Sequence, residues 1–231
     1  MQAIIITAYK NKNYLQKLIS FFDKKYRVFV HIDKKSDISI NDMNVNENVT
    51  IIKKYNIKWG GLNHLLAILE LLRIASEQPD INYYHIISGQ DIPVKSLSEF
   101  SIFENEEKIF MQCENIKNKD FNFKKRYRNG VLFSNGDFRK IIEKIMNKLY
   151  SFTHKPRYYI SKYKEHDIYI GLVWCYFPQG VAKYVLKYCN VHNFPRGWQH
   201  IKIPEEFFFQ TIIANSKFKN KIVSNNLRYM D

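Results

Sequence analysis

The chain has 231 residues, a formal net charge of +14, 45% hydrophobic residues and 16% aromatic residues. So much apolar surface in a chain of this length can form a substantial core, which excludes an intrinsically disordered protein. No run of apolar residues approaches the roughly 20 positions that a membrane-spanning helix needs. The positive charge suits a partner with phosphate groups, such as a nucleotide, a nucleic acid or an anionic lipid. A solvated surface rich in Lys and Asn would carry the same charge.

The start of the chain and its cysteines indicate a cytoplasmic protein. Met1 leads directly into a strand-like segment, so we expect no signal peptide. The three cysteines are too far apart in sequence for a disulfide framework or a zinc site. We therefore expect reduced thiols at Cys113, Cys175 and Cys189.

In the first half of the chain, apolar segments alternate between strand-like and helix-like patterns. The predicted elements are strands at residues 3–9, 26–33, 49–55 and 83–88 and a helix at residues 11–23. A further apolar helix follows Gly60 and Gly61, and Asn63 is its predicted N-cap.

The alternation continues in the second half, without repeats or low-complexity tracts. The predicted elements are strands at residues 108–113, 168–177 and 221–225 and helices at residues 137–151, 178–188 and 204–215. Strands that alternate with helices predict the α/β class. We expect a mixed, mostly parallel central sheet flanked by helices, in one domain over residues 1–231.

Ligands of open α/β sheets collect at the carboxyl ends of the strands. The second predicted strand ends in His31, Asp33 and Lys34, and an acid at this point can hydrogen-bond a ribose or a base. Because no G-x-G-x-x-G follows the first strand, a mononucleotide fits better than a dinucleotide such as NAD. Asp33 could equally be a turn or cap residue.

The strand at residues 83–88 runs into Ser88-Gly89-Gln90-Asp91, directly before Pro93. The chain contains no Asp-x-Asp pair that would hold a divalent metal on a diphosphate. Lys and Arg side chains would then neutralise a diphosphate. Asp91 could instead only form the turn before the proline.

A third acidic motif is Pro204-Glu205-Glu206, followed by Phe207, Phe208 and Phe209. Pro suits the first turn of a helix, and acids in that turn are favoured by the helix dipole. A carboxylate held against aromatic side chains is also a candidate general base.

Taken together, these segments resemble a known family. The motifs "VHIDKKSD", "WGG", "YYHIISGQDIPV", "GLVW" and "PEEFFFQTIIANS" occur in the order found in the core-2/I-branching glycosyltransferases. This family includes the β-1,6-N-acetylglucosaminyltransferases and the xylosyltransferases, and the chain is most similar to its short bacterial members. The resemblance covers residues 4–231.

The resemblance implies an inverting enzyme with a single nucleotide-binding domain of the GT-A type. The donor would be a UDP-sugar carrying N-acetylglucosamine or xylose, used without a metal ion or another cofactor. The acceptor would be a glycan or a lipid-linked oligosaccharide in bacterial surface polysaccharide synthesis. Family members continue beyond the position of Asp231 with an Arg-Lys pair that binds the diphosphate, so we expect the C-terminal part of the family domain to be missing here. Arg228 and lysines of this chain could instead supply this contact.

The resemblance also assigns roles to individual residues. Glu206 matches the Glu of the family's Pro-Asp-Glu motif and would be the catalytic base, whereas Glu205 replaces the family's Asp. Trp174 and Glu205 would contact the acceptor. The expected donor contacts are His31, Asp33, Lys34, Trp59, Ser88, Gly89, Gln90, Asp91 and Arg228.

Two other functions fit the composition. Tyr and Phe among many Lys residues could stack single-stranded nucleic acid, although most of these aromatics fall on apolar faces that favour core packing. A nucleotidyltransferase would need metal-binding carboxylates and a Gly-rich loop, and neither is visible. Our main interpretation therefore includes no nucleic acid.

The amphipathic segment at residues 137–151 indicates a further partner. It carries Arg139, Lys140, Lys144 and Lys148 beside an apolar stripe. Such a helix can rest on the inner face of an anionic membrane, or it can simply pack on the domain.

Overall fold

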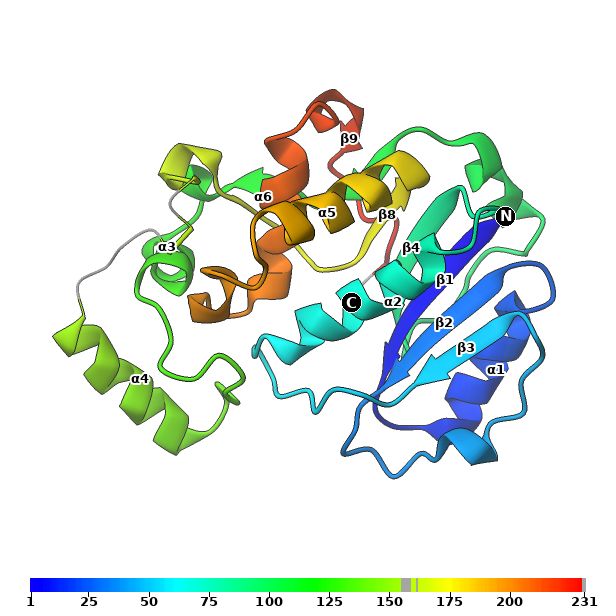
Figure 1. Ribbon diagram of the computed structural model, residues 1–231, viewed down its shortest axis with the longest axis horizontal. Coiled ribbons are helices and arrows are strands. Elements are labelled where there is room, and N and C mark those ends of the chain that lie inside the picture. Colours follow the sequence, from blue (N-terminus) through cyan, green and yellow to red (C-terminus); the bar gives the residue numbers. More distant parts are fainter. Residues whose placement is uncertain (155–158, 161, 230–231) are drawn as a thin grey trace.

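The computed structural model describes residues 1–154, 159–160 and 162–229. Its centre is a seven-stranded sheet in the order β3-β2-β1-β4-β8-β5-β9 (Figure 1). The strands are β1 (Gln2–Ala8), β2 (Arg27–Ile32), β3 (Val49–Ile52), β4 (Tyr83–Ser88), β5 (Ile109–Met111), β8 (Cys175–Pro178) and β9 (Ile222–Val223). The first four strands run parallel, β8 is antiparallel to both of its neighbours, and β9 pairs parallel with β5. A separate two-stranded sheet joins β6 (Glu114–Asn115) to β7 (Tyr169–Ile170).

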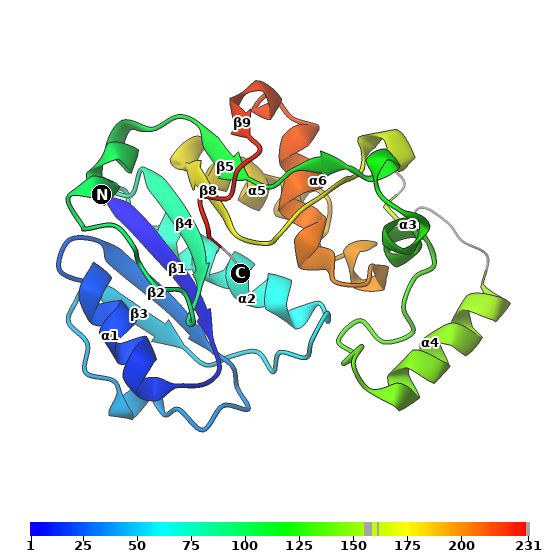
Figure 2. The same ribbon diagram turned by 180° about the vertical axis from the view of Figure 1, so that it is seen from behind.

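Helices cover both faces of the central sheet (Figures 1 and 2). The helices of the described residues are α1 (Lys12–Phe22), α2 (Asn63–Ser76), α3 (Phe121–Arg128), α4 (Ile141–Thr153), α5 (Gln179–Val191) and α6 (Phe208–Ala214). Of these, α1 packs on one face of the sheet and α2, α5 and α6 pack on the other. Successive side chains of a strand point to opposite faces, so β1 contributes to both layers. Ile4 and Ile6 pack in the cluster that contains the apolar face of α1, whereas Ala3 and Ile5 pack in the cluster of α2, α5 and α6. The predicted α/β class and the mostly parallel sheet are confirmed.

The prediction of one strand over residues 168–177 is wrong, because this segment divides into β7 and β8. Gly171 lies so close to Gln112 that any side chain would overlap the Gln112 carbonyl oxygen. The Gly171 N–H donates to the carbonyl oxygen of Glu206 (3.0 Å) instead of to a neighbouring strand. The chain therefore leaves one sheet at Gly171 and joins the other at Cys175.

Three predicted helix starts are also wrong. The helix expected from residue 137 begins at Ile141, because the carboxylate of Asp137 accepts hydrogen bonds from the backbone and side chain of Arg139 and forms a turn. The helix expected from Pro204 opens as a 3-10 turn, Pro204–Glu206, and α6 begins only at Phe208. The N-cap of α2 is Leu62 rather than Asn63, whose amide donates to the Asn56 carbonyl oxygen (2.9 Å).

Among the described residues, no helix is both long enough and apolar enough to cross a membrane. The three cysteines are unpaired. The limits of a single domain over the whole chain stay a prediction.

Candidate functional site

The two predicted strand ends lie on either side of the end of β1. The N–H of Asp33, directly after β2, donates to the carbonyl oxygen of Ala8 (2.8 Å). The N–H of Gly89, directly after β4, donates to the carbonyl oxygen of Thr7 (2.8 Å). The parallel register of β2, β1 and β4 thus brings together two segments that are far apart in the sequence.

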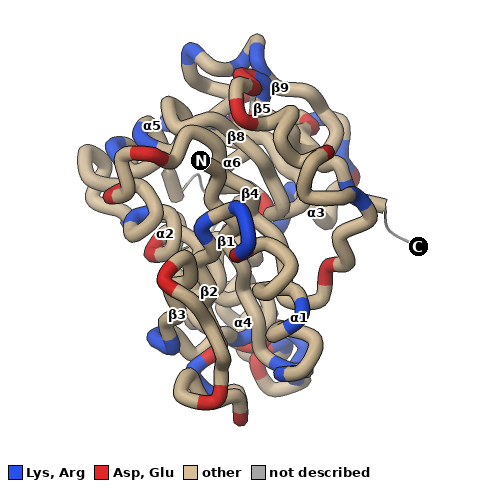
Figure 3. The backbone as a smooth tube through the Cα atoms, turned by 90° about the vertical axis from the view of Figure 1, so that its right-hand side faces the viewer, with Lys and Arg blue, Asp and Glu red and all other residues tan. Residues whose placement is uncertain are grey.

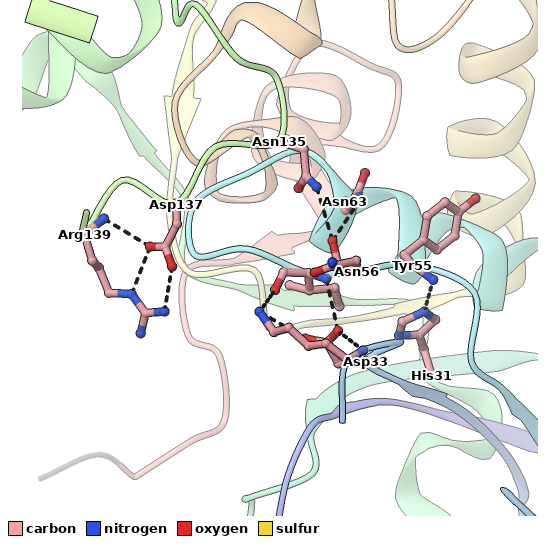
Figure 4. Close-up of polar contacts among 10 residues, drawn as sticks. His31, Asp33, Tyr55, Asn56, Asn63, Asn135, Asp137 and Arg139 are labelled. Carbon is pink, nitrogen blue, oxygen red and sulfur yellow. Dashed lines mark hydrogen bonds and ion pairs between the residues drawn. The ribbon is translucent and has the colours of Figure 1, made fainter. Parts of the chain in front are cut away.

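His31 is a buried, neutral acceptor on one side of this edge. Its Nε2 accepts a hydrogen bond from the backbone N–H of Tyr55 (2.9 Å), as Figure 4 shows. Burial lowers the pKa of His31 to about 4, although the nearby Asp33 carboxylate opposes this effect. The imidazole is therefore uncharged at neutral pH and fixes the loop that follows β3.

Asp33 organises the same loop. Only 3% of the residue is exposed, and its Oδ1 accepts from the N–H groups of Lys35 (3.1 Å) and Ile57 (3.2 Å). Asp33 thus acts as the turn residue that the sequence allowed, and its contact with a ligand stays a prediction. Lys34 is exposed and donates its backbone N–H to the Tyr55 carbonyl oxygen (2.9 Å).

Trp59 lies at the end of this loop with 49% of its surface exposed. Its carbonyl oxygen accepts from the N–H of Phe138 (3.2 Å), which joins the loop to the segment before α4. In Figure 4, the amides of Asn63 and Asn135 both point at the Asn56 carbonyl oxygen and make a second connection between these segments.

On the other side of β1, residues Ser88 to Asp91 form a closed turn. The Asp91 Oδ2 accepts from the Ser88 N–H (2.8 Å), and the Ser88 hydroxyl accepts from the Gln90 N–H (3.2 Å). Asn11, just before α1, donates to the Gln90 side chain (3.1 Å). The turn role considered for Asp91 is therefore also present.

The second carboxylate oxygen of Asp91 forms an ion pair with the guanidinium of Arg228. The Arg228 guanidinium carbon lies 4.4 Å from the centre of the Trp174 ring, a cation–π distance. Trp174 directly precedes β8. Because β8 runs antiparallel to β4, the start of β8 lies beside the carboxyl end of β4, and Trp174 is placed there. Three predicted site residues from distant segments thus meet here.

His64, in the first turn of α2, connects this group to the acidic motif, and the sequence analysis missed it. Its Nε2 lies 3.2 Å from the Thr7 hydroxyl, and its Nδ1 lies 3.2 Å from the Glu205 Oε1. The His64 ring also packs edge-on against Trp174, with 6.2 Å between ring centres. In the sequence, it is marked only by its position three residues after Gly61.

Glu205 is buried, with 5% of its surface exposed. Its second oxygen, Oε2, has no hydrogen-bond partner among the described residues. Glu205 therefore lies beneath the site beside His64, and its expected contact with an acceptor stays a prediction.

Glu206 points elsewhere and is partly exposed. Its Oε2 accepts from the Nη2 of Arg126 in α3 (2.7 Å). The Arg126 guanidinium carbon in turn lies 5.2 Å from the centre of the Phe207 ring. Phe207, Phe208 and Phe209 are fully buried and anchor the motif in the core. Arg126 was not among the site residues predicted from the sequence.

A surface hollow of about 520 Å³ lies nearby, lined by Lys58, residues 132–136 and Glu143. None of the predicted site residues lines it. Within the described part of the chain, no three His, Cys, Asp or Glu side chains form a group that could hold a metal ion. Metal-independent catalysis stays a prediction.

A parallel sheet with charged and aromatic side chains at its strand ends is typical of proteins that bind nucleotides. The comparison with known families is more specific, since the model of the Core-2/I-Branching enzyme family matches residues 3–231. The chain belongs to this family. The resemblance seen in the sequence is confirmed.

Two curated relatives show the same relationship at low identity. The chain is 23% identical to human "Xylosyltransferase 2", over an alignment that covers 93% of the chain and 24% of the human protein. The protein of the same name from Pan troglodytes gives the same identity and coverage. The chain thus spans about a quarter of the length of these relatives.

Proposed function

We propose that the chain transfers a sugar from a UDP-sugar to a hydroxyl group of a glycan. The observation that carries this proposal is the meeting of Asp91, Arg228 and Trp174 at the carboxyl end of β4. A guanidinium at this edge can neutralise a diphosphate, and Nη1 of Arg228 has no hydrogen-bond partner among the described residues. The nucleoside would bind across β1, beside His31, Asp33 and Lys34.

The reaction that we propose is a single displacement with inversion. Glu206 accepts the proton of an acceptor hydroxyl while that oxygen forms a bond to the anomeric carbon of the donor. The bond between this carbon and the diphosphate oxygen breaks, and UDP leaves with both bonding electrons. Since Glu206 is partly exposed, an acceptor can approach it, and the ion pair with Arg126 orients the carboxylate.

The identity of the substrates is also a proposal. The relatives named xylosyltransferase favour xylose as the donor sugar, and N-acetylglucosamine is the other sugar that the resemblance implies. We propose a glycan or a lipid-linked oligosaccharide of a bacterial surface polysaccharide as the acceptor. The reaction would proceed without a metal ion, with Lys and Arg neutralising the leaving group.

The main alternative, a module that binds single-stranded nucleic acid, has less support. Large aromatic side chains such as Tyr83, Tyr84 and Trp198 are fully buried and cannot stack on bases. Lys and Arg are distributed over the part of the backbone seen in Figure 3, with acidic residues between them.

Calorimetric titration with UDP, in EDTA and at moderate salt, tests the proposal. We expect saturable binding that added Mg²⁺ does not strengthen, and weaker binding of ADP. A folded protein that binds UDP neither with nor without Mg²⁺ would contradict the proposed donor. Steeply salt-dependent binding of single-stranded RNA, without affinity for UDP, would favour the nucleic-acid module.

A further inference from the structure

Helix α4 exposes its apolar face to solvent. Five of its large apolar side chains are between 54% and 76% exposed, and they are Ile141, Ile142, Ile145, Leu149 and Phe152. Positions that are three or four residues apart lie on the same side of a helix, so these side chains form one continuous surface. The apolar stripe that usually faces a core therefore has no cover within the described residues.

The opposite, polar side of α4 is the side that rests on the protein. The Asn147 Oδ1 accepts from the backbone N–H of Leu132 (3.0 Å), which lies in the segment before the helix. The carboxylate of Glu143 lies against Gly136, and its Oε2 is buried. The helix thus packs on the domain, and it does so through its polar side.

The charged side chains of α4 are also divided between its two sides. Glu143 is the only acidic residue between Ile141 and Thr153, and it is turned inward. Lys144 and Lys148 are exposed, and helical geometry places them at the border of the apolar surface. Lys140 and Arg139, just before the helix, are exposed as well. The exposed part of this element is apolar in the middle and positively charged at its edge.

The position of α4 in the fold leaves this surface accessible. Figures 1 and 2 show the helix at the periphery, away from the central sheet and from α1, α2 and α5. Its 13 residues span about 20 Å. This length suits a helix that lies in the plane of a membrane surface rather than one that crosses it.

We propose that α4 is a docking element for an anionic lipid bilayer, with its apolar side chains among the acyl chains and its lysines at the head groups. Charge complementarity favours this partner over a second copy of the chain, because two α4 helices face to face would bring like charges together. The inference rests on the proposed function only where it concerns the acceptor. A lipid-linked acceptor and the enzyme would then meet at the same surface.

Co-sedimentation with lipid vesicles tests the docking element. We expect the protein to bind vesicles that contain phosphatidylglycerol and to bind pure phosphatidylcholine vesicles much more weakly. Reversing two charges with Lys144→Glu and Lys148→Glu should weaken binding to the anionic vesicles by about tenfold or more. The pair Ile145→Asn and Leu149→Asn should weaken it at least as much, because these side chains enter the bilayer.

Ile102→Asn is the matched control. Ile102 lies in another segment, and its exposure of 73% equals that of Ile141. Binding of this variant to anionic vesicles should equal that of the unchanged protein. All the replaced side chains are exposed, so we expect equal thermal unfolding, and UDP titration of the same variants separates membrane binding from the proposed activity.

Two results would overturn the inference. One is vesicle binding that the Ile145 and Leu149 substitutions leave unchanged. The other is a concentration-dependent dimer that these substitutions abolish, together with no binding to anionic vesicles, which would make the α4 surface an interface between copies. A failure to bind UDP alone would count against the proposed function and would leave the membrane result standing.

Discussion

Arg126 of α3 holds the carboxylate of Glu206 at 2.7 Å, across 80 positions of the sequence. This charge-assisted contact fixes the orientation of the residue that we propose as the general base. The guanidinium of Arg126 is itself confined between the rings of Phe123 and Phe207, at 5.3 and 5.2 Å. The position of the carboxylate is therefore set by packing as well as by charge.

Replacing Glu206 by Gln should abolish most of the turnover. General-base catalysis typically contributes about 10²–10⁴-fold, and the amide cannot accept the proton. UDP affinity should stay unchanged, because the proposed donor site lies at other residues. Transfer rates and calorimetric titration with UDP on the same preparation would separate the two effects.

Glu165→Gln provides the matched control for this variant. Glu165 is also a partly exposed carboxylate paired with a cation, Lys124, at 3.2 Å. We expect it to retain full turnover. Unchanged turnover in Glu206→Gln would remove Glu206 from the role of base.

Arg126 should act as a positioning residue. We expect Arg126→Met to lower kcat with little change in the KM for the donor, since the carboxylate loses its orientation but the donor site is intact. Arg126→Lys should restore part of kcat, because the lysine keeps the charge but not the planar geometry. Equal kcat values for the two variants would show that the charge at this position does not matter.

Removal of the Arg228 side chain should weaken UDP binding. A charge-assisted hydrogen bond contributes about 1.5–3 kcal/mol, so Arg228→Ala should raise the Kd of UDP about tenfold to a hundredfold. Titration of Arg73→Ala is the comparison, because Arg73 is also paired with acids, Glu70 and Glu77, but lies on the surface of α2. An equal Kd for the two variants would exclude Arg228 from the donor site.

His64 and Glu205 should be coupled in stability. Glu205 is buried, and its contact with His64 (3.2 Å) is the only hydrogen bond of its side chain among the described residues. We expect His64→Leu to lower the free energy of unfolding by about 1–3 kcal/mol, because a buried polar group loses its partner. In Glu205→Leu the same histidine substitution should cost clearly less. Urea denaturation of the four proteins measures this difference, and additive effects would disprove the coupling.

The stability of the protein should fall as the pH decreases from about 6.5 to about 4. In this window the unfolded chain protonates His31, whose ordinary pKa is 6.5, but the folded protein does not, because burial lowers the pKa to about 4. The unfolded state then binds more protons, and acidification favours it. Above pH 6.5 this contribution to the pH dependence vanishes.

His31→Gln should reduce that dependence while keeping an acceptor for the Tyr55 N–H. The slope of the unfolding free energy should decrease by up to about 1.4 kcal/mol per pH unit. Urea denaturation at several pH values measures it. His85, whose pKa burial lowers to about 3, retains its own share in this variant.

The sequence predicted the strands of the central sheet well, because a strand buried on both faces leaves a continuous apolar run. The strand predicted at residues 83–88 matches β4 in both bounds. The hydrophobic pattern predicted the wrong strand bounds where a local contact decides the structure. At Gly171, the closeness of Gln112 ends the strand that the pattern continues. The exposure of the apolar face of α4 was also not predictable, since periodicity identifies an apolar face but not what covers it.

Within the candidate site, the sequence indicated residues at strand ends but not their partners. Asp33 and Asp91 follow strands and could be found from that position alone. His64 and Arg126 could not, because their roles come from contacts with Glu205 and Glu206, which are 141 and 80 positions away. Such pairs arise only when the chain is folded.

The closeness of Gly89 to β1 has a consequence for how the site keeps its shape. A Cβ atom at position 89 would lie 2.6 Å from the Cβ of Ala8 and 3.2 Å from its Cα. The backbone of Gly89 is thus in close contact with Ala8 at the point between the two halves of the proposed donor site. The spacing between Asp33 and Asp91 is thus a property of the backbone, with no long side chain as a spacer. Sequence change around this edge can therefore alter which donor is bound while the width of the site stays the same.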